Sequence, residues 1–186
     1  FKFLDQNGFT DCGAHSTAHA IMIDRLKQNL PFIRLNAVAV ATLMRRTNGG
    51  WCGLSMKFAR DHGFPVVGDG PGQWPYQTRH GNDTPELRAN MKLHRDLEDW
   101  YDLGREVYNQ VLTRKQLATA LFNNLPCPSD YNQFGHSMLS LRWIPKYRGP
   151  LTLNSWKGFG YHGLCVLADM VPDNAVVLRS STPSIR

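Results

Sequence analysis

The first part of the chain repeats apolar residues with the spacing of amphipathic helices. Apolar positions every three or four residues predict a first helix over about 12–28. Asn36 can cap a second helix over 36–46, and a third is expected to end at Gly63. Residues 64–82 are rich in glycine and proline, which predicts a loop.

The helical pattern resumes after this loop. Thr84-Pro85 opens a pattern whose apolar face runs to Val111, and Gly104 is expected to interrupt it. Thr113 and Gln116 form a capping box, which predicts a further helix. That helix is expected to bury three apolar side chains and to end at two prolines: Leu117, Leu121 and Phe122, then Pro126 and Pro128.

The last third of the chain has a different pattern. Four segments are short, apolar and separated by turn residues, which predicts strands at 137–143, 151–153, 163–167 and 175–178. The sequence therefore predicts an α+β protein with a mainly helical half, 1–112, and a mainly β half, 113–186. Any functional cleft is expected between these halves.

Composition narrows the class of protein. The chain has 186 residues, 42% of them hydrophobic and 11% aromatic, which is typical of a globular protein with a proper core. No apolar run approaches the roughly 20 residues of a membrane span, so no membrane association is expected. The net charge of +6 comes from scattered bases, which favours solvated faces over nucleic-acid binding. Four widely spaced cysteines favour a reducing compartment.

Cys12 lies at the predicted start of the first helix and could take three roles. It could be a nucleophile, a metal ligand together with His15 and His19, or an ordinary buried thiol. A helix N-terminus favours the thiolate that a nucleophile needs. Zinc would require a fourth ligand and supporting groups that the sequence does not offer, so no metal is expected.

The other groups that a thiol nucleophile needs occur elsewhere in the chain. His136 enters the first predicted strand of the β half and could serve as general base. Asn154, at the end of the next strand, could orient the imidazole, and Trp156 could shield their hydrogen bond from water. Gln6 lies six residues before Cys12, and its amide could reach the same oxyanion as the Cys12 N–H.

These segments resemble the papain family of cysteine peptidases. Gln6 and Cys12 match that family's glutamine and nucleophile at the same spacing, and His136 matches its general base. The stretch NSWKGFGYHG, which begins at Asn154, resembles the family's Asn-Ser-Trp-Gly block. The paired glycines Gly49 and Gly50 resemble a segment that binds substrate backbone, and the motifs occur in the family's chain order from about Gln6 to Leu167.

The resemblance implies both a fold and an activity. It implies a helical half packed against a β-barrel-like half, with the active site in the cleft between them. The implied activity is that of an endopeptidase, with a catalytic set of Gln6, Cys12, His136 and Asn154 and an acyl-enzyme intermediate, acting on a peptide or protein without a cofactor. The implied substrate-binding residues are Gly49, Gly50, Cys52, Gly135, Ser137 and Trp156.

Two departures from the family pattern stand out. Gly13 replaces the tryptophan that usually follows the nucleophile. Phe9 and Thr47 occupy positions where the family usually has half-cystines, so the typical disulfide of the helical half cannot form. The second departure favours a cytoplasmic or virion setting over a secreted or lysosomal one.

One other peptidase family is set aside, and two other classes of protein remain as alternatives. The start QNGFTDCGA also resembles peptidases that remove bacteriocin leaders, but those pair the histidine with Asp-Pro, which does not follow His136. The same scaffold could be a structural protein associated with a larger assembly such as a virion. It could also be an amidase or transpeptidase acting on cell-wall peptides.

Overall fold

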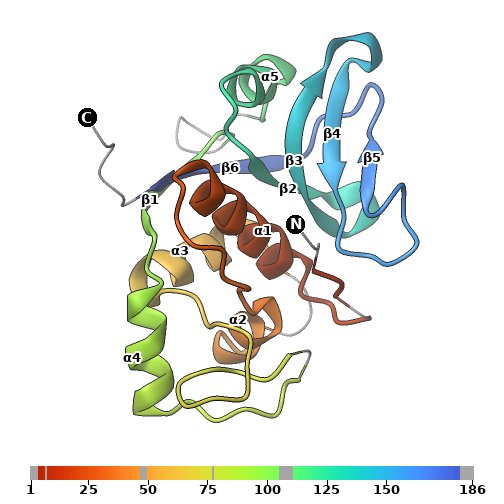
Figure 1. Cartoon of the computed structure of the whole chain (residues 1–186). Coiled ribbons are helices and arrows are strands. Elements are labelled where there is room, and N and C mark those ends of the chain that lie inside the picture. Colours follow the sequence, from red (N-terminus) through yellow and green to blue (C-terminus); the bar gives the residue numbers. More distant parts are fainter. Residues whose placement is uncertain (1–3, 7, 47–49, 77, 105–110, 181–186) are drawn as a thin grey trace.

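The computed structural model describes residues 4–6, 8–46, 50–76, 78–104 and 111–180. Within these residues there are five α-helices: α1 (Cys12–Lys27), α2 (Ala37–Leu43), α3 (Cys52–His62), α4 (Pro85–Leu93) and α5 (Arg114–Phe122). Figure 1 shows α1 at the centre of the molecule, with α2, α3 and α4 on one side and the sheet on the other. The helices expected over 12–28 and 36–46 are thus present, the second in shorter form.

The central helix is buried on nearly every side. From Cys12 to Met22 every residue of α1 is buried, and several are small, which lets neighbouring elements approach closely. The helix packs against α2, α3, β2 and β3. A helix enclosed in this way needs apolar or small residues around its whole circumference. This is why it lacks the sharp polar face of a surface helix.

A single antiparallel sheet forms the other layer. Its strands are β1 (Leu97–Asp102), β2 (Cys127–Tyr131), β3 (His136–Ile144), β4 (Gly149–Leu153), β5 (Leu164–Val166) and β6 (Asn174–Ser180). Their order across the sheet is β1-β6-β2-β3-β4-β5. Two short 3-10 helices, η1 (Asn132–Phe134) and η2 (Pro145–Tyr147), lead into β3 and β4. The four strands expected from the sequence correspond to β3, β4, β5 and β6.

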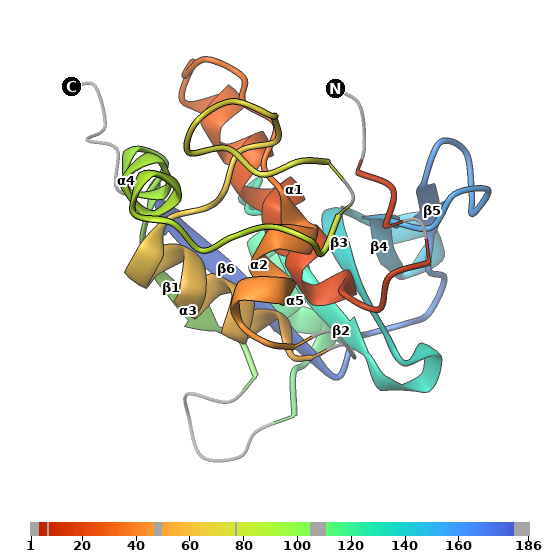
Figure 2. The same ribbon diagram turned by 90° about the horizontal axis from the view of Figure 1, so that it is seen from below.

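Alternation along β6 explains how the sheet is covered on both faces. Val176 and Leu178 belong to the large core that contains α1, α2 and α3. Ala175 and Val177 belong to a second core with Leu117 and other residues of α5. Because successive side chains of a strand point to opposite faces, α1 and α5 lie on opposite sides of the sheet. In Figure 1, α5 lies above β6 and α1 below it, and Figure 2 gives the view from below.

The helical pattern expected from Thr84 to Val111 is wrong beyond Leu93. The chain leaves α4 there and forms β1, which pairs with β6 through contacts such as Trp100 with Leu178. The apolar spacing of α4 does not continue beyond Met91, and the aromatic residues of β1 favour a strand once a partner is available. Residues 105–110 of the expected helix lie outside the described residues.

β2 is a second strand that the sequence analysis did not predict. Pro126 and Pro128 were expected only to end a helix, yet 127–131 pairs with both β3 and β6. Pairing with β6 is confined to Ser129 and Asp130, so Pro128 needs no N–H for that ladder. Phe122, expected to be buried, is 62% exposed.

The predicted α+β architecture is confirmed, but the sheet is not closed. Within the described residues β1 and β5 are the two edges of the sheet and do not pair with each other. The expected barrel-like half is therefore an open sheet whose edge strand β1 comes from the N-terminal part of the chain. No helix in the described part of the chain has the length and hydropathy needed to cross a membrane.

Candidate active site

Cys12 is the first residue of α1 and is almost fully buried. The helix begins there because the carbonyl of Asp11 accepts hydrogen bonds from the N–H groups of Ala14 and His15 at 3.0 and 3.1 Å. The N–H groups of a first helical turn have no partner within the helix and attract negative charge. Cys12 therefore lies at the end of α1 where the helix dipole is positive.

The histidines that follow Cys12 are engaged in other contacts. Nδ1 of His15 lies 3.3 Å from Oδ1 of Asp11, and Nε2 of His19 accepts a hydrogen bond from the N–H of Leu4 at 2.7 Å. Burial, with a smaller contribution from His15, lowers the pKa of His19 to about 3, so its ring is neutral. Among the described residues, no group of three or more His, Cys, Asp or Glu side chains could hold a metal ion.

His136 and Asn154 are joined by a direct hydrogen bond. His136 is the first residue of β3, and Asn154 directly follows β4, the neighbouring strand. Nε2 of the imidazole lies 2.8 Å from Oδ1 of Asn154, which also accepts the backbone N–H of Trp156 at 2.9 Å. With the Asn154 oxygen as acceptor, Nε2 carries the proton, and Nδ1 is left as the basic nitrogen.

Trp156 covers the imidazole. Its ring stacks on His136 with centroids 3.9 Å apart and planes inclined by 21°. Trp156 is 40% exposed whereas His136 is 5% exposed, so the indole separates the His136–Asn154 bond from water. Burial lowers the pKa of His136, and the hydrogen bond that its ring donates to Asn154 opposes that shift. The ring is therefore held neutral at pH 7, the form in which it can accept a proton.

Gln6 is hydrogen-bonded to Ser155, the residue that follows Asn154. The backbone N–H of Gln6 donates to the carbonyl of Ser155 at 2.9 Å, and the Ser155 hydroxyl donates to Oε1 of Gln6 at 2.5 Å. The side-chain amide of Gln6 donates to the carbonyl of Phe9. These hydrogen bonds hold the segment before α1 against the residues that follow β4, and they fix the orientation of the Gln6 amide.

A cavity of about 400 Å³, here named the Cys12 cavity, brings several predicted site residues together. Its described lining is Cys12, Gly50, Trp51, Asp130, Tyr131, Asn132, Gly135, His136, Ser137, Asp173 and Asn174. Gln6, Cys52, Asn154 and Trp156 are not among these residues, although Asn154 and Trp156 contact His136 directly. Gly49 lies outside the described residues.

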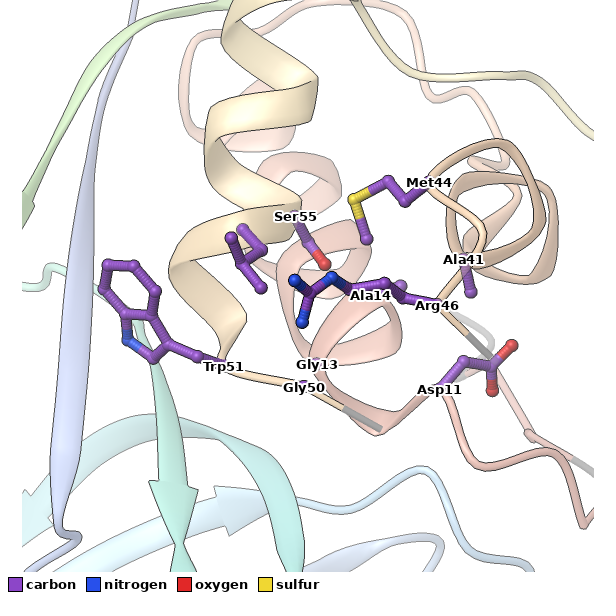
Figure 3. Close-up of a pocket in the computed structure, with 10 residues that line it drawn as sticks. Asp11, Gly13, Ala14, Ala41, Met44, Arg46, Gly50, Trp51 and Ser55 are labelled. Atoms are coloured by element: carbon purple, nitrogen blue, oxygen red, sulfur yellow. The ribbon is translucent and has the colours of Figure 1, made fainter. Parts of the chain in front are cut away.

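A second, much smaller cavity lies beneath Gly13. Figure 3 shows it enclosed by α1, α2 and α3, with the Arg46 side chain reaching across it. It measures about 10 Å³, which is too small for more than a water molecule. Gly50 and Trp51 line both cavities, so this segment forms the partition between them.

Solved structures resemble the chain over nearly its whole length. Digestive procathepsin L 3 from the larval midgut of Tenebrio molitor aligns with a TM-score of 0.72 and 16% identity, over 96% of this chain and 66% of that one. Xylellain, a cysteine protease from Xylella fastidiosa, aligns with a TM-score of 0.73 and 14% identity, over 98% and 84%. The chain thus spans just under two thirds of the procathepsin chain. No protein-family model and no curated protein sequence matches it.

Both neighbours are papain-like cysteine proteases. The chain has the papain-like fold. The resemblance seen in the motifs is thereby confirmed at the level of the fold, with the open sheet described above. In this papain-like fold, the segments that carry Cys12 and His136 come from the central helix and from the strand that packs against it.

The close approach of Gly50 explains the unusual glycine at position 13. A Cβ placed on Gly13 would lie 2.7 Å from the carbonyl oxygen of Gly50, closer than side-chain atoms are found. Trp51, after Gly50, instead supplies an indole beside the partition, where it packs edge-on against Trp100 with centroids 5.4 Å apart. The absence of a side chain at Gly13 is therefore a packing requirement of the segment that separates the two cavities.

Asp130 and its partners form a buried network that the sequence analysis missed. Oδ2 of Asp130 accepts from the backbone N–H of Cys52 at 3.3 Å and from its thiol at 3.2 Å, and Oδ1 accepts from the Ser137 hydroxyl. Cys52 is fully buried behind Asp130, and burial together with that carboxylate raises its thiol pKa well above the usual value. Burial also raises the pKa of Cys127 to about 12. Both thiols are therefore protonated and unreactive at neutral pH.

Proposed function

We propose that the protein is a cysteine peptidase in which Cys12 is the nucleophile and His136 the general base. One observation carries the proposal: His136, fixed by Asn154 and covered by Trp156, lines the same cavity as the thiol at the start of α1. The likeness of the fold to xylellain, a cysteine protease, supports the proposal.

The reaction proceeds through a thioester. Nδ1 of His136 takes the thiol proton of Cys12, and the sulfur attacks the carbonyl carbon of the peptide bond. The resulting oxyanion collapses, the C–N bond breaks, and His136 donates its proton to the leaving amine. Water then loses a proton to His136 and attacks the thioester, which releases the carboxylic acid and restores the thiol.

Two residues assist this chemistry without being covalently changed. The side-chain oxygen of Asn154 accepts a hydrogen bond from the protonated Nε2 of His136, which keeps Nδ1 available to the thiol. Gln6, anchored by Ser155, is assigned to the oxyanion together with the backbone N–H of Cys12. A side-chain amide has two hydrogens, so the bond from Gln6 to Phe9 leaves one of them for the substrate.

The substrate is a peptide or protein bound in an extended conformation. Gly50, at the edge of the Cys12 cavity, and its neighbour Gly49 are assigned to the substrate backbone, which would pair with them as an added strand does. Gly135 and Ser137 flank His136 and line the same cavity. They are assigned to the substrate residues closest to the cleaved bond.

The test is turnover of a fluorogenic peptide mixture under reducing conditions. We expect Cys12→Ala to lower turnover by at least about a hundredfold. Cys165→Ala is the matched control, because Cys165 is a partly exposed thiol that lines neither described cavity. Equal turnover by the wild type and Cys12→Ala would refute the proposal. Mass spectrometry of the products separates hydrolysis from transfer to an added amine or release of cell-wall peptides.

A further inference from the structure

The Cys12 cavity has an acidic wall. Asp130 and Asp173 both line it, and no lysine or arginine is among its described lining residues. The chain as a whole carries a net charge of +6, so this local excess of carboxylates runs against the overall charge. Asp173 is exposed and accepts the backbone N–H of Asn132 at 2.7 Å, whereas Asp130 is 9% exposed. The two carboxylates therefore sit at different depths of one cavity.

The deeper carboxylate is held in a fixed position. Asp130 belongs to β2, and Ser137 lies directly opposite it on β3 and donates to Oδ1. Cys52, at the start of α3, donates to Oδ2 from both its backbone and its thiol. Burial raises the pKa of Asp130, so these donors only partly compensate for its lost hydration. A buried carboxylate in this situation gains from a cation brought into the cavity.

The side-chain amide of Asn174 lies on the same wall. Asn174 pairs with Asp130 across the β2–β6 ladder and is 8% exposed. Both polar atoms of its side chain are buried, and neither has a hydrogen-bond partner among the described residues. Buried side-chain polar groups in folded proteins nearly always have a partner. Asn174 also lines the Cys12 cavity, so a donor bound there can become a partner of its amide oxygen when the side chain turns towards the cavity.

We propose that the Cys12 cavity receives the cationic side chain of an arginine or lysine of the substrate, recognised by Asp130 and Asn174. This inference rests on the proposed peptidase function, because the cavity also holds Cys12 and His136. A guanidinium or ammonium group supplies only donors, which match the carboxylate of Asp130 and the amide oxygen of Asn174. Trp51 lines the same cavity and offers apolar surface to the aliphatic stem.

The experiment compares arginine with citrulline, which has nearly the same shape and no charge. Fluorogenic peptides carry one or the other at each of the three positions before the cleaved bond, with alanine elsewhere. Wild type, Asp130→Asn and Asp69→Asn are compared by the ratio of kcat/KM for the two peptides. Asp69→Asn changes the net charge equally, at an exposed residue that lines neither described cavity. The ratio does not depend on the fraction of each variant that is folded.

At one of the three substituted positions, we expect the wild-type kcat/KM to be about tenfold or more higher for arginine than for citrulline. This is the usual effect of a hydrogen bond to a charged group. The preference should fall towards one in Asp130→Asn and persist in Asp69→Asn. A ratio near one at every position, or a preference that survives Asp130→Asn, overturns the inference.

A binding measurement separates this inference from the peptidase proposal. Fluorescence anisotropy with labelled arginine and citrulline peptides is carried out on Cys12→Ala, with and without Asp130→Asn. Suppose that the wild type cleaves neither peptide, while the arginine peptide still binds more tightly than the citrulline peptide and loses this advantage in Asp130→Asn. In that case the peptidase proposal fails and the cation site stands. Equal or absent binding of the two peptides overturns the cation site, whatever the turnover.

Discussion

The α-carbon of Gly13 faces the carbonyl oxygen of Gly50 so closely that a Cβ at position 13 would lie 2.7 Å from it. This contact joins the residue after the candidate nucleophile to the segment assigned to substrate backbone. It also accounts for the missing tryptophan, because any side chain at position 13 would displace Gly50 and the partition between the two cavities.

Gly13→Ala should therefore destabilise the protein. We expect the free energy of unfolding to fall by about 1–3 kcal/mol, the usual cost of adding a group where packing is already tight. Urea denaturation followed by circular dichroism measures the change. Gly70→Ala is the control, because its Cβ would approach only the flexible end of Gln73, at 3.2 Å. A Gly13→Ala variant as stable as the wild type would show that the Gly50 segment yields without cost.

Asn154 and Trp156 both contact His136, and replacing them should shift the pH profile of kcat/KM in opposite directions. The neutral imidazole is the base, so kcat/KM should fall as pH drops through the His136 pKa. The Asn154 hydrogen bond raises this pKa and burial lowers it. Asn154→Ala should therefore move the acid limb to lower pH, whereas Trp156→Ala, which exposes the ring, should move it to higher pH.

Both variants should also lower kcat, by about tenfold to a hundredfold, because a misplaced catalytic group costs that much. Steady-state kinetics from pH 4 to pH 8 on one fluorogenic peptide measures both effects. A merely structural role for Asn154 and Trp156 would reduce the amount of active enzyme and leave the acid limb in place. Shifts in the same direction would contradict the assigned environment of His136.

His19 should make the protein sensitive to acid. Its folded-state pKa of about 3 lies below the value of 6.5 for an exposed histidine. Between these values the unfolded chain binds a proton that the folded chain does not, so stability falls as pH drops below 6.5. The expected slope is up to about 1.4 kcal/mol per pH unit.

Urea midpoints at pH 7, 6, 5 and 4 test this expectation on wild type and His19→Gln. Glutamine keeps an acceptor for the Leu4 N–H and cannot titrate, so its slope should be shallower. The exposed His80 provides the control variant, His80→Gln, which should keep the wild-type slope. Identical slopes for His19→Gln and wild type would refute the assignment.

Much of the fold could be predicted from local pattern, and the errors have a common physical origin. The helix at 12–28 and the strands of the last third carry their signals in a few neighbouring residues. β1 carries no such signal, because its pairing partner β6 lies more than 70 residues further along the chain. The prolines around Cys127 concealed β2 in the same way, since only the ladders with β3 and β6 make that segment a strand.

The same limit applies to the candidate site. Cys12, Gly50, Gly135, His136 and Ser137 were singled out by motif and line one cavity. Asp130 and Asn174 were missed, because their place beside Ser137 follows from the unpredicted strand β2. Cys52, expected to bind substrate, lies behind Asp130, a position that depends on the packing of α3 against that strand.

The most direct measurement is acid-quenched mass spectrometry of the protein during turnover of an activated peptide ester. The account predicts a mass increase equal to the acyl group, mapped to the fragment that contains Cys12 and absent in Cys12→Ala. His136→Ala should slow its formation by at least about a hundredfold. Turnover without an adduct on Cys12, undiminished in Cys12→Ala, would contradict the claim that this thiol is the nucleophile.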